Sequence, residues 1–268
     1  MVKKLFKYEF RSYLRTLIPV NLILLAIALM GRIVQFFESD SIAYGLVFGS
    51  SVFMLCAAII VAYLLTVIMV VVRFYKNLFT SEGYLSFTLP VTPVQHILTK
   101  LLTAVLFQVI TTAAVFLSLM IMTSGELLVE IFKAAGYLFA DLFSEVMGWH
   151  LVLFIPEYLL ALVIGVAYQF LLYYACISLG QRANKNRVLM AVVCYFAYYM
   201  IVQVLSTVLM VLLTVIELDF SFLETFFESL GLGALHILIW FYLIASAGLC
   251  TLWFFITHKT IKTRLNLE

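Results

Sequence analysis

Residues 44–72 read YGLVFGSSVFMLCAAIIVAYLLTVIMVVV and contain no charged side chain. A helix needs about 20 consecutive apolar residues to cross the hydrocarbon core of a bilayer, and this stretch is longer. Its apolar residues do not alternate with polar ones, as they would in a strand of a transmembrane barrel. Backbone polar groups in lipid must be satisfied within a helix or a closed barrel. The stretch therefore predicts a transmembrane helix.

The rest of the chain has the same character. Of its 268 residues, 65% are hydrophobic and only 11% are charged, and the mean hydropathy is +1.15. Soluble domains carry about 25% charged residues, so the composition predicts an all-α, polytopic membrane protein with a single transmembrane domain over residues 1–268. The cysteines lie in apolar runs, and their spacing is typical neither of a disulfide framework nor of a metal site. They are Cys56, Cys176, Cys194 and Cys250.

Hydropathy predicts six membrane spans, at about 17–37, 44–72, 97–123, 151–179, 188–216 and 232–257. Lys and Arg gather before the first span, in the loops after the second and fourth spans, and after the sixth. The other loops carry mainly Asp and Glu. Because basic loops remain on the cytoplasmic side, we expect a multi-pass protein of the cell membrane with both termini in the cytoplasm. An even number of spans is consistent with this.

Residues 1–16 have a pattern of their own. Four basic side chains share one helical face and five apolar ones share another, which predicts an amphipathic helix lying in the plane of the inner membrane surface. The alternative is a simple basic flank that sets the topology. The basic face holds Lys4, Lys7, Arg11 and Arg15, and the apolar face holds Phe6, Phe10, Tyr13, Leu14 and Leu17.

The predicted second span is followed by a polar segment, RFYKNLFTSEGYLSFTLPVTPVQHILTK, at residues 73–100. Aromatic and apolar residues recur at helical spacing over 74–79, which predicts a short amphipathic helix that continues from the span and ends at Gly83. Residues 85–89 alternate like an extended strand. Thr92, Pro93 and Gln95 predict a capped helix start, and Lys100 is expected to extend back to the lipid headgroups.

This segment is several times longer than a simple reversal of the chain requires. Tyr75, Phe79 and Tyr84 are large aromatic side chains that a partner protein can bury. The sequence thus favours either a docking site for a soluble partner or a loop packed on its own membrane domain.

Residues 74–102, FYKNLFTSEGYLSFTLPVTPVQHILTKLL, resemble the inner loop of the ABC-2 family of ABC transporter permeases. The resemblance lies in Glu82-Gly83, in Leu89-Pro90-Val91-Thr92 and in the run from Ile97 to Leu102. It implies that two permease subunits form the pathway and that each docks a coupling helix onto a separate ATPase subunit, which binds ATP and Mg. The residues it places in that docking site are Arg73, Phe74, Tyr75, Lys76, Phe79, Glu82 and Gly83. The acidic loop 217–231 resembles the family's short outer helices.

The chain has no G-x-x-x-x-G-K-[ST] sequence, so it shows no P-loop of its own. The four histidines are scattered, which disfavours a metal cluster. Glu157, beside Pro156, is the only acid near the start of a span. We therefore predict no enzymatic activity, metal or cofactor in this chain, and no nucleic-acid partner. Membrane lipid is an expected partner.

Few polar residues interrupt the spans. A stripe on the fifth span either lines a cavity or packs against another helix; it comprises Gln203, Thr207, Met210 and Thr214. Gly45 and Gly49 form a G-x-x-x-G pattern that favours close helix packing within or between subunits.

The leading hypothesis is the permease subunit of an ATP-driven ABC exporter for a hydrophobic or amphipathic substrate, such as a peptide, drug or lipid. The alternatives are an ion-coupled secondary transporter and a non-transporting membrane immunity or sensor protein.

Overall fold

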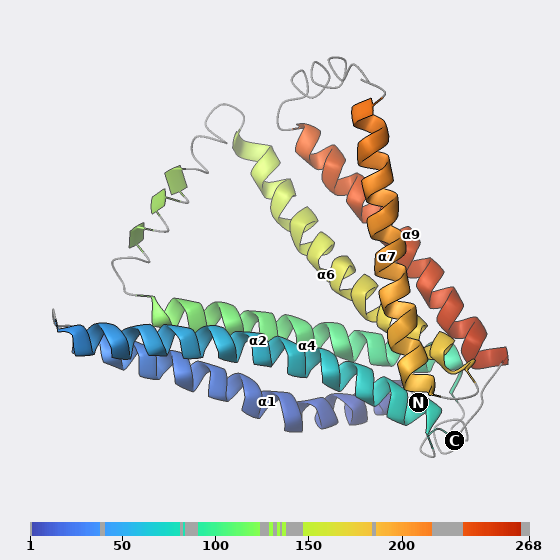
Figure 1. The fold of residues 1–268 in the computed structure, drawn as a ribbon, viewed down its shortest axis with the longest axis horizontal. Helices are drawn as coiled ribbons and strands as arrows, with labels where there is room; N and C mark the ends of the chain where they lie inside the picture. The colour runs from blue at the N-terminus through green and yellow to red at the C-terminus, as the bar shows by residue number, and fades with distance from the viewer. Residues whose placement is uncertain are drawn as a thin grey trace. The chain divides into compact units, whose positions relative to one another are not determined.

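The computed structural model describes residues 2–37, 41–80, 83, 91–123, 129–130, 133–134, 136–137, 147–183, 186–215 and 233–263. Within these residues the secondary structure is helical, with no strand. The long helices are α1 (Val2–Gln35), α2 (Ile42–Phe79), α4 (Pro93–Met122), α6 (Met147–Gly180), α7 (Arg187–Val215) and α9 (Gly233–Thr263) (Figure 1). All six are long and apolar enough to cross a membrane. The prediction of a helical, multi-pass membrane protein is thereby confirmed.

Several helices are longer than a bilayer requires. The 38 residues of α2 correspond to roughly 57 Å at 1.5 Å per residue, against a hydrocarbon core of about 30 Å. The excess includes Arg73–Phe79, which continues the helix as the spacing of its apolar residues predicted. The helix ends at Phe79 rather than at Gly83.

The helices group into two compact units. The first comprises Met1–Phe74 and Pro90–Glu145, and the second comprises Tyr75–Leu89 and Val146–Glu268. The sequence shows no boundary between them because both halves are equally apolar.

In the first unit, α1 and α4 run parallel and α2 runs antiparallel to both (Figure 1). Their core is mainly apolar, and within it Thr111 of α4 lies within hydrogen-bond distance of Asn21 of α1 and Thr66 of α2. Its buried members are Leu24 and Ala28 of α1, Leu55 and Ala62 of α2, and Val115 and Met122 of α4. This packing holds the three helices in a fixed register.

The N-terminal segment 1–16 is not a separate helix, because α1 continues unbroken from Val2 to Gln35 and includes Pro19. The buried side chains of α1 explain this difference from the sequence-based expectation. Tyr13 and Leu17 are buried, as are Leu24 and Ala28 farther along the helix. One continuous face therefore packs within the unit on both sides of the predicted boundary.

The start of α4 follows the sequence-based prediction. The Thr92 hydroxyl accepts a hydrogen bond from the Gln95 backbone N–H, and the Gln95 side chain accepts one from the Thr92 N–H. This reciprocal capping box satisfies two backbone donors at the helix terminus. Pro93 occupies the first turn, where its missing N–H has no cost.

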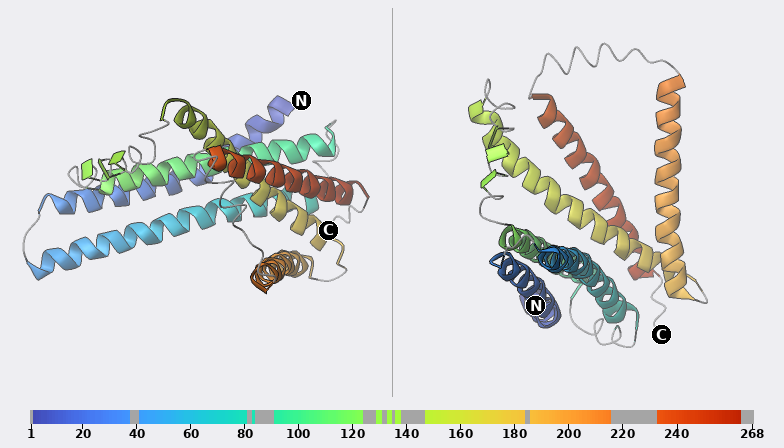
Figure 2. Two further views of the ribbon diagram at one scale, coloured as in Figure 1. Left: turned by 90° about the horizontal axis from the view of Figure 1, so that it is seen from above. Right: turned by 60° about the vertical axis from the view of Figure 1, so that its left-hand side comes forward.

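In the second unit, α6 packs along α9 in the same direction and against α7 in the opposite direction. Helices α6 and α7 are closest where α6 ends and α7 begins, and they diverge toward the other end (Figure 2). Tyr168 and Tyr198 join them by a contact between their hydroxyls. Much of the surface of α7 is consequently exposed.

Candidate functional site

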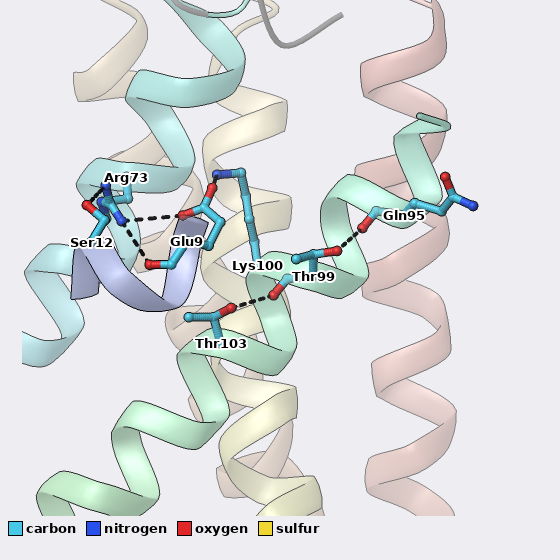
Figure 3. Close-up of polar contacts among 7 residues, drawn as sticks. All are labelled: Glu9, Ser12, Arg73, Gln95, Thr99, Lys100 and Thr103. Atoms are coloured by element: carbon cyan, nitrogen blue, oxygen red, sulfur yellow. Dashed lines mark hydrogen bonds and ion pairs between the residues drawn. The ribbon is translucent and has the colours of Figure 1, made fainter. Parts of the chain in front are cut away.

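A buried ion network joins the three helices of the first unit where α1 begins (Figure 3). Nζ of Lys100 donates a hydrogen bond to Oε1 of Glu9 at 2.5 Å. Nη1 of Arg73 lies 3.4 Å from the other carboxylate oxygen. Glu9 is only 8% exposed and Lys100 only 4%. One carboxylate of α1 thus binds cations of both α2 and α4.

Arg73 makes further contacts with α1. Its Nη2 donates to the hydroxyl of Ser12, and its Nη1 also lies 3.4 Å from the backbone oxygen of Glu9. The guanidinium lies 5.0 Å from the centre of the Tyr13 ring, a distance typical of a cation–π contact. The charged group of Arg73 is therefore held inside the first unit.

The prediction that Lys100 extends to the lipid headgroups is wrong. The lysine is buried and pairs with Glu9. A buried ammonium is unfavourable unless a partner compensates its charge, and Glu9 provides that partner. The hydroxyls of Thr99 and Thr103, on the same helix, donate to backbone oxygens one turn earlier (Figure 3).

Aromatic side chains of α1 and α4 pack next to the ion network. The ring of Phe107 on α4 lies 5.1 Å from Phe10 and 5.3 Å from Tyr13, measured between centroids. Phe107 and Tyr13 are buried. These rings keep the ion network in an apolar environment, where a charge–charge contact is stronger than in water.

The network contacts both ends of one polar segment of the chain. Arg73 and Lys100 are the first and last residues of the polar segment 73–100, and Glu9 contacts both. Both ends of this segment are therefore joined to α1 by ion pairs. One carboxylate with two cations leaves a formal charge of +1.

The predicted docking residues on α2 differ in accessibility. Phe74 and Phe79 are buried, whereas Tyr75 is half-buried and Lys76 is exposed. The rings of Tyr75 and Phe79 lie 6.5 Å apart. Of the four, Lys76 and part of Tyr75 remain available to another molecule.

Two predicted docking residues follow α2. Gly83 is buried, and its N–H donates to the Thr80 backbone oxygen at 2.7 Å. Glu82 lies outside the described residues, as do residues 85–89 and 217–231.

The polar stripe on α7 is exposed in the structure. Gln203, Thr207 and Met210 are exposed, whereas the side chain of Thr214 lies outside the described residues. The Thr207 hydroxyl donates to the Gln203 backbone oxygen at 2.8 Å. Residues 201–212 of α7 are all exposed, so exposure does not distinguish this stripe from the other faces of the helix.

Gly45 and Gly49 do not pack closely against another helix in the described part of the chain. A Cβ atom added at either glycine meets nothing within 4 Å. Among the described residues of one subunit, no helix therefore packs closely against these glycines. Close packing between subunits stays a prediction.

A second polar cluster lies near the starts of α6 and α9. Glu157 Oε2 is 2.6 Å from Nδ1 of His236, and Trp240 Nε1 donates to Oε1 at 2.9 Å. The side chains of Glu157 and His236 are 13% and 15% exposed. Both residues are noticeable in the sequence, but nothing there indicates that their side chains are in contact. Among the described residues no group of three or more His, Cys, Asp and Glu side chains gathers as a metal site.

Sequence reasoning did not identify Glu9. The available signal was that Glu9 is the one acid among five basic residues within positions 3–15. Its partners lie 64 and 91 positions away, so only the packing of three helices reveals its role.

Comparison with protein-family models, curated proteins and solved structures found no match for this chain.

Proposed function

We propose that this chain is the membrane-spanning permease subunit of an ATP-driven ABC exporter, of the ABC-2 type that residues 74–102 resemble. A separate ATPase subunit binds ATP and Mg, and a second permease subunit completes the pathway. The observation that carries the proposal is the contact of Glu9 with both ends of segment 73–100. A segment that receives force from a partner must be connected firmly to the spans, and this network provides that connection.

In the proposed mechanism the ATPase docks on the exposed part of segment 73–100. Lys76 and Tyr75 are accessible for this contact, and the resemblance adds Glu82. When ATP binding draws the ATPase subunits together, the segment moves with them. Arg73 and Lys100 transmit this motion to Glu9 and so to α1.

The membrane arrangement in this proposal follows the charges of the loops. Both termini lie in the cytoplasm, and the basic N-terminal part of α1 contacts the inner surface of the cell membrane. The polar stripe of α7 is the candidate lining of the pathway. A hydrophobic or amphipathic substrate suits a pathway with few charges.

The test is to express the chain with candidate ATPase subunits, copurify the complex and measure ATP hydrolysis in lipid. We expect Glu82→Lys to lower copurification or ATPase activity severalfold, because it reverses a charge at the docking site, while membrane insertion is preserved. Glu130→Lys makes the same change in a loop assigned to the other side and serves as the matched control. Normal assembly and transport in the Glu82→Lys variant contradicts the docking role.

The contact between Glu157 and His236 favours a second candidate, a proton-coupled carrier. Carriers of this kind use ionisable residues within the membrane, and this pair lies between two predicted spans. Transport that an ionophore abolishes and that needs no ATP identifies the carrier. Transport that requires a copurifying ATPase identifies the permease.

A further inference from the structure

We propose that the exposed face of α1 binds an anionic phospholipid of the inner leaflet, with the lipid phosphate between Arg11 and Arg15 and the acyl chains along the apolar side chains that follow. The inference rests on the membrane arrangement of the proposed function, which places the start of α1 at the cytoplasmic surface. It does not depend on an ATPase, because the face belongs to a single helix of the first unit.

Helix α1 has two opposite faces. Glu9, Tyr13 and Leu17 are buried on one of them, and this face continues through Leu24 and Ala28. The residues on the other side recur at helical spacing, so they share one face. All of them are exposed, and they are Lys4, Arg11, Arg15, Ile18, Leu22 and Leu29. Because α1 is one continuous helix, this exposed face is also continuous.

The exposed face changes from cationic to apolar along its length. Arg15 is its last cation, and Ile18, Leu22 and Leu29 are 40%, 59% and 52% exposed. From Ile18 to Leu29 the helix rises roughly 16 Å at 1.5 Å per residue. This rise is close to half of a hydrocarbon core of about 30 Å. An anionic headgroup followed by an acyl chain that fills one leaflet has the complementary chemistry in the same order.

The cations of this face lack a protein anion. None of the five basic side chains at positions 3–15 makes an ion pair with a described residue; they are Lys3, Lys4, Lys7, Arg11 and Arg15. Glu9 lies among them in the sequence, but it is buried and contacts Arg73 and Lys100. The loop charges assign two further acids to this side, Glu82 and Glu268, which lie outside the described residues. Two carboxylates carry too little charge to neutralise five cations.

Arg11 and Arg15 are the pair best placed for a phosphate. They lie one helical turn apart, where side chains are neighbours on the helix surface, and they adjoin the apolar part of the face. A guanidinium can bind phosphate oxygens through two parallel hydrogen bonds. A soluble anion would leave the apolar part uncovered, and a second copy of α1 would bring like charges together. A phospholipid satisfies both parts of the face.

Lipid titration of the full-length protein in dodecyl maltoside tests the proposal, with native mass spectrometry as the readout. We expect dioleoylphosphatidylglycerol to bind more tightly than dioleoylphosphatidylcholine, whose headgroup has no net charge. Arg11→Gln combined with Arg15→Gln should weaken the binding of phosphatidylglycerol about 30-fold, roughly fivefold for each cation at the membrane surface. The binding of phosphatidylcholine should change much less.

The matched control is Lys259→Gln combined with Lys262→Gln. These lysines are exposed near the end of α9, which the loop charges assign to the same side, and the double substitution removes the same charge. It should leave the affinity for phosphatidylglycerol nearly unchanged. An equal loss in both double variants indicates a general attraction to basic surface and overturns the proposal. Equal affinities of the unmutated protein for the two lipids also overturn it.

Two further measurements use the unmutated protein. Inorganic phosphate at equal ionic strength should not displace phosphatidylglycerol, and displacement would indicate a site for a soluble anion and overturn the proposal. A photoactivatable phosphatidylglycerol should label residues 11–29 of α1, and labelling confined to other segments overturns the proposal even where the arginine variant does not fold. None of these measurements involves an ATPase, so their outcome is distinct from that of the test for the proposed permease.

Discussion

At the scale of single residues, the side chain of Glu9 connects three helices at once. It accepts from Lys100 of α4 and faces Arg73 of α2, and it is almost completely buried. The two cations that contact this carboxylate differ in exposure. Lys100 is 4% exposed, whereas the Arg73 side chain is 22% exposed and also contacts Ser12 and Tyr13.

The position of Glu9 between two cations gives a testable order of stabilities. We expect Glu9→Gln to lower the free energy of unfolding by about 3–5 kcal/mol, because it removes the anion that contacts both the buried Lys100 and the partly buried Arg73. Lys100→Met should cost less, about 1–3 kcal/mol, since Glu9 keeps Arg73. Unfolding in a fixed detergent or bicelle mixture measures both variants, with the exposed Glu130→Gln as control. A larger loss for Lys100→Met than for Glu9→Gln contradicts the central role of Glu9.

At the scale of elements, α6 and α7 approach each other most closely at Gly180. A Cβ added there lies 2.7 Å from the backbone nitrogen of Ala191 and 2.8 Å from the backbone oxygen of Arg187. Both atoms belong to the first turns of α7, and backbone cannot move aside as a flexible side chain can. Glycine is therefore required at this position by the packing of the turn.

Gly180→Ala is expected to destabilise the protein by about 1–3 kcal/mol through overpacking. Gly248→Ala supplies the matched control within α9, because a Cβ there meets nothing within 4 Å. That control should be neutral or stabilising by up to about 1 kcal/mol, since alanine favours a helix more than glycine does. Thermal unfolding followed by circular dichroism compares the two. Equal effects of the two substitutions indicate that the close approach at Gly180 does not constrain the turn.

At the scale of the whole molecule, each unit has faces that no helix of that unit covers. Gly45 and Gly49 on α2 and Gln203 on α7 are examples. Among the described residues, the side-chain amide of Gln203 makes no hydrogen bond, and lipid cannot provide one. We therefore expect another protein surface or a water-filled path to satisfy that amide, as the proposed assembly from two subunits would provide.

Replacing both Gly45 and Gly49 by leucine tests assembly through α2. The fold of a single chain should be unaffected, with a change in unfolding free energy within about 0.5 kcal/mol, because nothing lies within 4 Å. The dimer fraction should fall, because small residues allow close helix contact in lipid. Native mass spectrometry measures this fraction, with Gly248→Leu as the control at another open glycine. An unchanged dimer fraction excludes this face as the contact between copies.

The sequence by itself determined the features that depend on composition and on neighbouring residues. Six apolar stretches predict six spanning helices, because a backbone in lipid must satisfy its own hydrogen bonds. The capping box at Thr92 was predictable because its partners lie three residues apart. The extension of α2 through Arg73–Phe79 followed from helical spacing in the same way.

Tertiary structure decided the contacts between residues that are distant in the chain. The partners of Glu9, the meeting of Glu157 with His236 and the continuous course of α1 all depend on which helix faces pack together. In a chain this apolar, every face of a helix is hydrophobic enough to be buried, so periodicity does not distinguish the packed face from the lipid-exposed one. Packing selects that face, and only then do isolated polar side chains acquire partners.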